Sequence, residues 1–374
     1  MIKILISDPL LRKTFDVVNI ILTKVDIDSL VFICYDKNSL NKTKKIYGTT
    51  NLHYVRQDRF EEDLYVVSQK YYDYKIIYIP IEESTTISFY EFIKKNSKKN
   101  FLFYLPKVED FNLSRNKDDL NKFCENNKIP CPKYYSEKQI IEGDFEFPII
   151  LKPINGSGSN GIKFIKNLND LSSFKIDYKN NFIQELLNNP KDVEAGFYLC
   201  SEGEIISFYS HERIRTFPEQ GGVSVFSRSS HNTEIFNAGA KIIKELNWSG
   251  FIMIEFIKCN KSKEYKLIEI NPRLWGSFLL SEFCGANFIS NYISLCKGDK
   301  LEKKIFVKEK YIRWIFPYDL IYFLKKPENP FKFFKIKDDT CYVNFSYSNL
   351  IKSFRFILFS YFDYKKIKQK IFNG

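Results

Sequence analysis

Histidine, methionine, glycine and proline are all scarce in this chain. Its 374 residues include three histidines, two methionines, 15 glycines and 13 prolines. Three histidines leave little room for histidine-based metal chemistry, and so little glycine and proline excludes collagen-like and linker-rich chains. The eight cysteines are scattered without a Cys-x-x-Cys pair, so the sequence does not indicate a zinc site and predicts reduced thiols in the core.

Long apolar segments are missing as well. No run approaches the roughly 20 uncharged apolar residues that a membrane-spanning helix requires. The short apolar run at the N-terminus predicts a first strand rather than a signal peptide. We therefore expect a cytoplasmic protein without a transmembrane segment.

What is present is the composition of a soluble globular chain, with 44% apolar and 27% charged residues. Its length exceeds what one hydrophobic core usually organises, so we expect two or three compact units. The net charge is +12, and residues 301–374 hold 16 Lys and Arg against seven Asp and Glu. The rest of the chain is nearly balanced, a distribution that argues against nucleic acid as a partner.

The first hundred residues alternate short apolar runs with polar, helix-compatible stretches. The runs at 2–6, 29–34, 75–79 and 101–105 are rich in β-branched and aromatic residues. This alternation predicts a parallel α/β sheet over residues 1–113. Ser-Asp-Pro follows the first run in place of a glycine-rich turn, so nothing favours dinucleotide binding. A helix capped by Ser114 should follow and end before the extended Ile129-Pro-Cys-Pro link.

Beyond residue 147 the pattern changes to hairpins and antiparallel sheets, which makes the chain α/β and α+β overall. We expect helices at 233–246, despite Gly239, and at 275–296, and a terminal amphipathic helix at about 350–372. The predicted domains are 1–113, 114–186, 187–300 and a basic, aromatic extension at 301–374. The predicted strands are at 147–151, 162–165, 181–187, 193–199, 204–210, 222–227, 251–257 and 265–270.

The sharpest local signal is the loop Lys152-Pro-Ile-Asn-Gly-Ser-Gly-Ser-Asn-Gly161 between two predicted strands. Its glycines and serines supply backbone N–H groups and hydroxyls, and Lys152 adds a positive charge, so the loop can fold over phosphate oxygens. A flexible hairpin turn is the alternative. The residues concerned are Lys152, Gly156, Ser157, Gly158, Ser159 and Gly161.

A second signal joins Glu255, in an apolar strand, to the sequence Ile268-Glu-Ile-Asn-Pro-Arg273. Residues two apart in a strand share a face, so Glu269 and Asn271 project together while Ile268 and Ile270 face the core. If the two strands pair antiparallel, Glu255 lies opposite them. Such oxygen donors suit Mg²⁺ (or Mn²⁺) on nucleotide phosphates, with Arg273 close by. The alternative is a solvated polar face.

Two arginines form a candidate substrate site. Arg213 and Arg215 are two apart and should share a strand face, next to a close turn at Gly222. Paired guanidinium groups can hold a carboxylate or a phosphate. A basic sheet edge that discourages strand pairing explains the same residues equally well.

From about residue 117 to about 295, these motifs in this order resemble the ATP-grasp superfamily, after an N-terminal α/β domain similar to the family's own. Glu269-Ile-Asn-Pro-Arg-Leu-Trp-Gly-Ser and Arg213-Ile-Arg-Thr-Phe-Pro-Glu-Gln-Gly-Gly-Val-Ser look like the predicted ATP-dependent carboligases related to carbamoyl-phosphate synthetase. Asn189-Pro-Lys-Asp-Val-Glu is similar to a stretch of biotin carboxylase. The resemblance implies a two-subdomain ATP-grasp fold over 114–186 and 187–300, with ATP and Mg²⁺ as cofactors.

The resemblance also implies roles for individual residues. Phosphate contacts fall to Lys117, Lys152 and the loop from Gly156 to Gly161. Catalytic roles fall to Arg273 and Lys152. Adenine and ribose contacts fall to a hinge strand and its successor, at Gln184, Glu185, Leu187 and Glu194. The metal ligands would be Glu255, Glu269 and Asn271.

The expected activity is ATP-dependent joining of a small-molecule carboxylate to an amine through an acylphosphate, in cell-surface polysaccharide or small-metabolite synthesis. A kinase that stops at phosphoryl transfer and a non-catalytic nucleotide-binding pathway component remain alternatives. A homodimer is the default assembly. The C-terminal tail either packs on the body or touches an anionic membrane surface.

Overall fold

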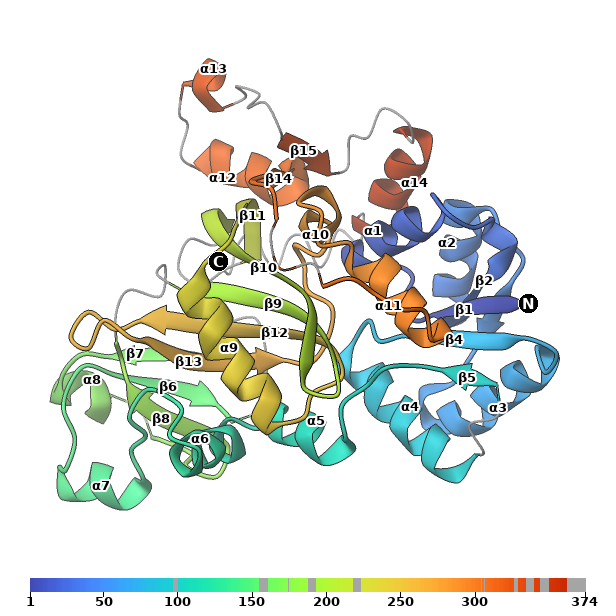
Figure 1. Cartoon of the computed structure of the whole chain (residues 1–374). Coiled ribbons are helices and arrows are strands. Elements are labelled where there is room, and N and C mark those ends of the chain that lie inside the picture. The colour runs from blue at the N-terminus through green and yellow to red at the C-terminus, as the bar shows by residue number, and fades with distance from the viewer. Residues whose placement is uncertain are drawn as a thin grey trace.

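The computed structural model of the protein describes residues 1–96, 100–154, 161–173, 175–187, 193–217, 223–303, 305, 307–325, 329–333, 340–343 and 350–361. In this part of the chain the strands form three sheets, of five, seven and three strands. The five-stranded sheet belongs to the N-terminal α/β domain, the seven-stranded sheet lies at the centre, and the three-stranded sheet lies at the far side (Figure 1). The mixed α/β and α+β class is confirmed.

The N-terminal sheet is parallel throughout, with strand order β3-β2-β1-β4-β5. Strand β5 is shorter than predicted, and strand β3 was not predicted because its three residues, Leu-His-Tyr, are too few to form a recognisable apolar run. The strands are β1 (Ile2–Ile6), β2 (Leu30–Cys34), β3 (Leu52–Tyr54), β4 (Lys75–Ile79) and β5 (Phe101–Leu102). The helices are α1 (Arg12–Ile21), α2 (Lys37–Tyr47), α3 (Phe60–Lys70) and α4 (Glu83–Lys95), with 3-10 turns at Ile27–Ser29 and Gln57–Arg59.

Strand order reverses direction beside β1, because β2 lies on one side of it and β4 on the other. The loops at the carboxyl ends of β1 and β4 therefore diverge at this point, where open α/β sheets commonly bind ligands. Glu82 and Glu83 follow β4 at this edge, and Lys13 lies in the first turn of α1, which follows β1. The fold thus directs three charged side chains toward the rest of the molecule.

A helix does begin near the predicted position, but the cap is different. Helix α5 (Val108–Arg115) runs through Ser114, whose hydroxyl donates to the carbonyl of Phe111. Asn116 ends α5 and caps α6 (Lys117–Asn126) by accepting from the N–H groups of Asp118 and Asp119. The cap predicted at Ser114 was therefore wrong, and Lys117 is the first residue of α6.

The three-stranded sheet has the order β7-β6-β8 and is antiparallel. One face packs on its own small core, in which Ile149, Leu151 and Ile183 are buried. The elements are α7 (Glu137–Glu142), β6 (Ile149–Pro153), β7 (Lys163–Ile165), α8 (Leu168–Ser172) and β8 (Asn181–Glu185).

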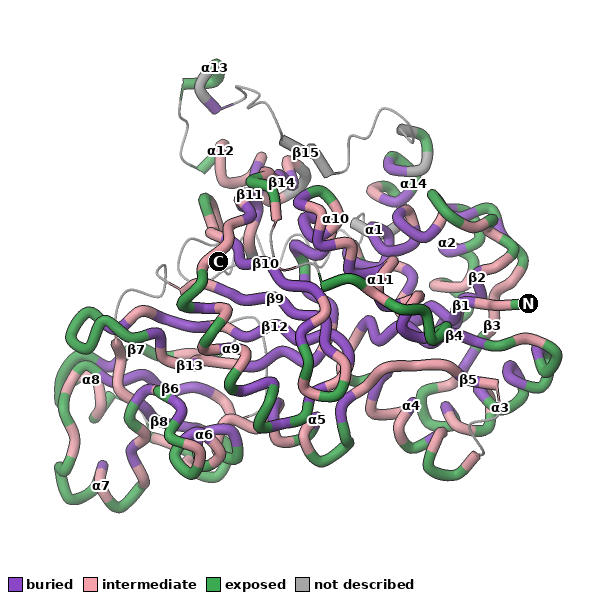
Figure 2. The backbone as a smooth tube through the Cα atoms, in the orientation of Figure 1, coloured by how far each residue is buried: buried purple, intermediate pink, exposed green. Residues whose placement is uncertain are grey.

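The seven-stranded sheet has the order β13-β12-β9-β10-β11-β14-β15, and only β14–β15 is parallel. Helix α9 covers one face, over a core that includes Tyr198 and Ile254. The other face shares a core with the N-terminal sheet, so the two domains pack directly together (Figures 1 and 2). The elements are β9 (Val193–Ser201), β10 (Glu204–Phe217), β11 (Val223–Ser230), α9 (Thr233–Glu245), β12 (Gly250–Lys258), β13 (Tyr265–Asn271), β14 (Tyr311–Trp314) and β15 (Thr340–Val343).

The single helix predicted at 275–296 was wrong. Turns follow β13, and then come two separate helices, α10 (Leu280–Phe283) and α11 (Phe288–Lys297). Between them Gly285 and Asn287 adopt positive φ angles of 92° and 52°, which a continuous right-handed helix excludes. The C-terminal extension adds a π-helical turn at Ile315–Asp319, α12 (Leu320–Lys325), α13 (Pro330–Phe333) and α14 (Leu350–Tyr361). The predicted continuation of the last helix to 372 lies outside the described residues.

Seven cysteines have described side chains, and all are free thiols. Six of them are buried and Cys131 is half-buried. No described helix is long and apolar enough to span a bilayer.

Gly239 provides a test of the packing between α9 and the central sheet. A Cβ at Gly239 would lie 2.0 Å from Tyr198 Oη, which donates a hydrogen bond of 2.7 Å to the carbonyl of Ile235. Alanine favours a helix by about 1 kcal/mol over glycine. Overpacking should nevertheless dominate, so we predict that Gly239→Ala lowers the free energy of unfolding by about 1–3 kcal/mol, measured by urea denaturation. In a Tyr198→Leu background the same substitution should be neutral or stabilising, and an equal loss in both backgrounds would contradict the prediction.

Asp16 provides a test of pH dependence. Its side chain lies on α1, is 2% exposed and has an oxygen, Oδ2, without a hydrogen-bond partner. Burial raises its pKa from 3.8 to about 7, although Arg12 opposes the shift. The native state therefore keeps a proton that the unfolded state releases between about pH 4 and 7, so stability falls as pH rises through this window.

We predict that wild-type stability, compared with that of Asp16→Asn, declines by up to about 1.4 kcal/mol per pH unit between about pH 4 and 7 and levels off above. Urea denaturation at a series of pH values measures this difference. Parallel stability curves for the two proteins would contradict it.

Candidate functional site

The register of β12 and β13 brings the predicted metal ligands together. The two strands are antiparallel, Glu255 is paired with Glu269, and Met253 is paired with Asn271. A bulge separates the pairs Glu255–Glu269 and Phe256–Leu267, which leaves Ile268 as the extra residue. Ile270 lies in the core beneath α9, whereas Ile268 is only half-buried, in contrast to the prediction. Glu255, Glu269 and Asn271 therefore share the opposite face.

Two carboxylates on one face create an unfavourable charge density. The pKa of Glu269 is raised from 4.5 to about 7, mainly by burial and also by Glu255, although Lys117, Lys152 and Arg273 lower it. Nη2 of Arg213 donates to Glu255 Oε1, so one oxygen of that carboxylate is paired with a cation. The two acids thus depend on cations that come from four different elements.

Lys152 reaches this group from the small sheet. It lies on β6 opposite Phe182, and Gln184 lies two residues further along the facing strand, so both side chains project away from the small core. Both are buried, with exposed fractions of 7% and 4%. Burial lowers the pKa of Lys152 to about 8, while the nearby Glu269 and Glu255 raise it and Lys117 lowers it. The two sheets therefore bring Lys117, Lys152, Glu255 and Glu269 within electrostatic reach of one another.

Of the loop from Lys152 to Gly161, the structure describes residues 152–154 and Gly161. Gly161 has a φ of +76°, and a Cβ there would lie 2.9 Å from Cγ of Pro153, so glycine is needed at this position. Gly156, Ser157, Gly158 and Ser159 lie outside the described residues, as does Gly222.

The charged side chain of the predicted hinge strand is bonded within the protein. Glu185 accepts from the N–H of Lys133 at 2.8 Å and from Nζ of Lys266 at 2.7 Å, so its side chain is engaged within the protein. Leu187 is half-buried at the end of a described segment. The N–H groups of Glu185 and Leu186 also donate within the protein, to the carbonyls of Lys133 and Pro148.

Glu194 is not brought to this group. Its carboxylate accepts from Tyr265 Oη at 2.6 Å and from Asn232 Nδ2 at 3.2 Å. Along β9 its neighbour Ala195 faces the core shared with the N-terminal domain, so Glu194 projects toward the α9 face. Glu255 lies opposite Ala195 and on the other face.

Arg213 and Arg215 do not share a strand face, and that prediction was wrong. The pairing shifts between Arg213–Ser227 and Arg215–Phe226, which makes Ile214 an extra residue and reverses the alternation. Arg213 pairs with Glu255, whereas Arg215 pairs with Asp319 of the C-terminal extension and lies 4.6 Å from the ring of Phe333. Only Arg213 belongs to the candidate site.

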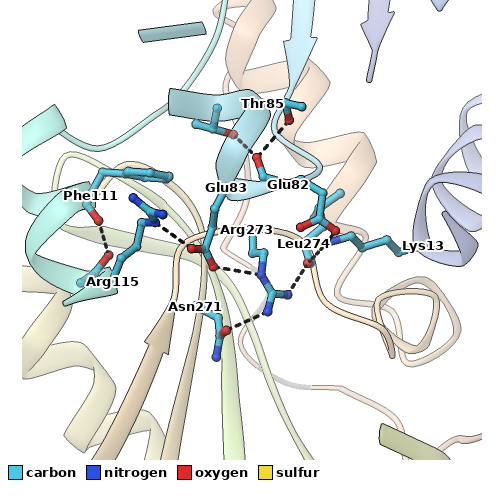
Figure 3. A network of polar contacts seen from close by, with 11 residues as sticks. Lys13, Glu82, Glu83, Thr85, Phe111, Arg115, Asn271, Arg273 and Leu274 are labelled. Atoms are coloured by element: carbon cyan, nitrogen blue, oxygen red, sulfur yellow. Dashed lines mark hydrogen bonds and ion pairs between the residues drawn. The ribbon is translucent and has the colours of Figure 1, made fainter. Parts of the chain in front are cut away.

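Arg273 is held by the N-terminal domain, which the sequence did not indicate. Its Nε donates to Glu83 Oε1 at 3.0 Å and its Nη2 donates to Asn271 Oδ1 at 3.0 Å (Figure 3). The other carboxylate oxygen of Glu83 accepts from Arg115 Nε at 2.7 Å. Glu83 therefore lies between two arginines and orients the one that follows β13.

A second ion pair reinforces this contact. Lys13 Nζ lies 2.6 Å from Glu82 and donates to the carbonyl of Leu274 at 2.9 Å, next to Arg273 in the sequence (Figure 3). A cavity of about 250 Å³ opens between these acids, Lys117 and Glu269. The signal that could have identified Glu82 and Glu83 was their position directly after a buried parallel strand.

The donor set fits a divalent cation that binds oxygen. Glu255, Glu269 and Asn271 offer two carboxylates and an amide, and a bound cation would offset the burial and the repulsion from Glu255 that together raise the pKa of Glu269. No group of three His, Cys, Asp or Glu side chains that could hold a metal occurs within the described segments. The remaining ligands of such an ion would have to come from phosphate or water.

Comparison with known families gives one match, over residues 120–304, to the ATP-binding domain of the carbamoyl-phosphate synthase L chain. Among curated proteins, pyruvate carboxylase from Aspergillus terreus is 24% identical over 184 residues, which cover 45% of this chain. That alignment covers 15% of the pyruvate carboxylase, so this chain matches only a small part of its relative.

Solved structures agree on the fold over a longer part of the chain. N5-carboxyaminoimidazole synthetase from Staphylococcus aureus has a TM-score of 0.63 at 17% identity, with coverage of 87% of this chain and 86% of that one. The biotin carboxylase domain dimer of 2-oxoglutarate carboxylase from Hydrogenobacter thermophilus, in complex with MgADP, ADP and bicarbonate, has a TM-score of 0.63 at 15% identity. Its match covers 83% of this chain and 73% of that one.

The ion pairs of Glu83 with Arg115 and Arg273 lead to a prediction. Glu83→Ala removes the acceptor of both Arg115 and Arg273, whose side chains are largely but not fully buried. We expect the free energy of unfolding to fall by about 1–2 kcal/mol in urea denaturation. Glu91→Ala, an exposed acid on the same helix, serves as the control and should be neutral.

A double-mutant cycle with Arg273→Ala separates the contact from general effects of the substitutions. Coupling of about 1 kcal/mol between Glu83 and Arg273 is expected for a partly buried charged hydrogen bond. If the two substitutions lower the free energy of unfolding by strictly additive amounts, the predicted interaction between Glu83 and Arg273 is contradicted.

Proposed function

Residues 120–304 of this chain belong to the ATP-grasp family represented by the ATP-binding domain of the carbamoyl-phosphate synthase L chain, and on this basis we propose an ATP-dependent carboxylate–amine ligase. The observation that supports the proposal most is the pairing of Glu255 with Glu269 on one sheet face, within electrostatic reach of Lys117, Lys152 and Arg273. Two acids facing several cations suit a triphosphate with its metal better than they suit a structural ion pair.

In the first step an oxygen of the substrate carboxylate attacks the γ-phosphorus of ATP, and ADP leaves. The acylphosphate that forms keeps the transferred phosphoryl group. Lys117 and Lys152 neutralise the phosphate oxygens, and Arg273 faces the charge that develops between the substrate carboxylate and the phosphoryl group. Lys152 is suited to this role because its burial weakens competition from water.

Glu255, Glu269 and Asn271 would hold Mg²⁺ (or Mn²⁺), which supplies charge neutralisation at the phosphates. The MgADP in the Hydrogenobacter thermophilus structure supports this assignment by analogy of fold. Gln184, the backbone around Glu185 and Leu187 would line the nucleotide base. The resemblance assigns Gly156 to Gly161 to the phosphates, where an acylphosphate requires the exclusion of water.

In the second step an amine attacks the carbonyl carbon of the acylphosphate, and an amide bond forms as inorganic phosphate and a proton leave. The cavity beside Glu82, Glu83 and Arg273 is the space in which we place the acceptor. Arg213 is the remaining candidate for a substrate contact, since it already reaches Glu255. The biotin carboxylase domain with a similar fold is a dimer, which supports a homodimer here.

The experiment is ADP release by the purified protein with Mg²⁺-ATP and a panel of amino acids and nucleotide-sugar acids, followed by mass spectrometry of the products. For the substrate pair that stimulates turnover, Glu269→Gln should reduce kcat by on the order of 10²-fold. Glu264→Gln, an exposed acid in the turn before β13, is the matched control and should leave kcat unchanged.

The product decides among the alternatives. An amide together with ADP and phosphate supports the ligase. A phosphorylated product without an amide indicates a kinase, and ATP binding without turnover across the panel indicates a non-catalytic role. Full activity of Glu269→Gln would contradict the proposed metal site, whichever product is formed.

A further inference from the structure

Helix α14 is anchored to the N-terminal domain by one of its faces. Phe356 is 1% exposed, and its ring stacks on that of Phe15 in α1 with 4.3 Å between centroids. Ser353 on the same face is also buried, and Lys45 of α2 lies 5.3 Å from the ring of Phe359. The helix lies beside α1 and α2 at the edge of the molecule (Figure 1).

The opposite face of α14 is apolar as well. Ile351, Phe354 and Leu358 follow the i, i+3, i+7 spacing of one helical stripe, and their exposed fractions are 72%, 65% and 40%. A helix that needs only to pack on the protein body would present polar residues on this side. Three large apolar side chains in one exposed row mark a surface built for contact with something outside the chain.

The positive charge near this apolar row favours an anionic partner. Helix α2 contains four lysines and no acidic residue, and Lys37, Lys44 and Lys45 are exposed. Arg355 is exposed on α14 itself. In the sequence, residues 362–374, which follow the helix, contain four further lysines and a single aspartate. A second copy of the chain would bring like charges together and is disfavoured by that repulsion.

We propose that Ile351, Phe354 and Leu358 of α14, together with the lysines of the adjoining helix α2, dock the protein on an anionic lipid surface. The apolar row enters the boundary between headgroups and acyl chains, and the basic residues contact lipid phosphates. Because the row is short, binding is reversible and depends on salt. The proposal is independent of the reaction, since it uses no residue of the candidate active site.

Vesicle flotation of the full-length protein tests this proposal. Vesicles of phosphatidylcholine alone are compared with an equal mixture of phosphatidylcholine and phosphatidylglycerol, at low and high salt. The wild type should float with the anionic vesicles at low salt and remain in solution with the neutral vesicles or at high salt. The double variant Ile351→Ser with Phe354→Ser should reduce the floating fraction at least tenfold, because it removes the apolar row but retains Phe356.

Two further variants keep the test decisive. Ile141→Ser alters an equally exposed apolar residue on α7, in the small subdomain, and should float like the wild type. Lys37→Glu with Lys44→Glu should abolish flotation at a lower salt concentration than in the wild type. Unchanged thermal unfolding shows that each variant is folded.

Any of three results would overturn the proposal. The first is equal flotation of the wild type and the double variant, and the second is no flotation of the wild type with anionic vesicles. The third is a self-associated wild type in analytical ultracentrifugation that the double variant converts to monomer, which would assign the stripe to a second copy of the chain.

Discussion

The repulsion between two facing carboxylates is the constraint around which the centre of this molecule is arranged. Glu255 and Glu269 are directly paired on neighbouring strands, and their partial burial weakens the screening of their charges by water. Cations from several elements compensate: Lys117 from α6, Lys152 from β6, Arg213 from β10 and Arg273 from the turn after β13. None of these elements could separate from the others without leaving buried charge unpaired, which is costly in a low-dielectric interior.

The N-terminal domain contributes to the same balance. Through Glu83 it holds Arg273, and through Lys13 it binds the carbonyl of Leu274. The two domains also share an apolar core. The contacts that pack the two domains together are therefore also the contacts that orient Arg273. Any motion that separates the domains would also break the ion pair between Glu83 and Arg273.

Bulges decide which side chains reach the site. On β13 the extra residue Ile268 keeps Glu269 and Asn271 on the face of Glu255 although the apolar residues before it alternate in the other phase. On β10 the extra residue Ile214 sends Arg215 away from Arg213 and toward Asp319 of the C-terminal extension. The bulge on β13 places the predicted metal ligands on one face, and the bulge on β10 places Arg213 and Arg215 on opposite faces.

The sequence by itself determined the parallel first sheet, the antiparallel pairing of β12 with β13, and the strand face that Glu269 shares with Asn271. These features follow from apolar periodicity and from the alternation of side chains along a strand, which are local properties. Only the tertiary structure decided that Glu83 holds Arg273, that Glu194 faces α9, and that a bulge separates Arg213 from Arg215. Contacts between residues far apart in the chain, and the single extra residue that reverses a strand's alternation, leave no periodic trace in the sequence. They arise when whole elements pack and neutralise one another's charges.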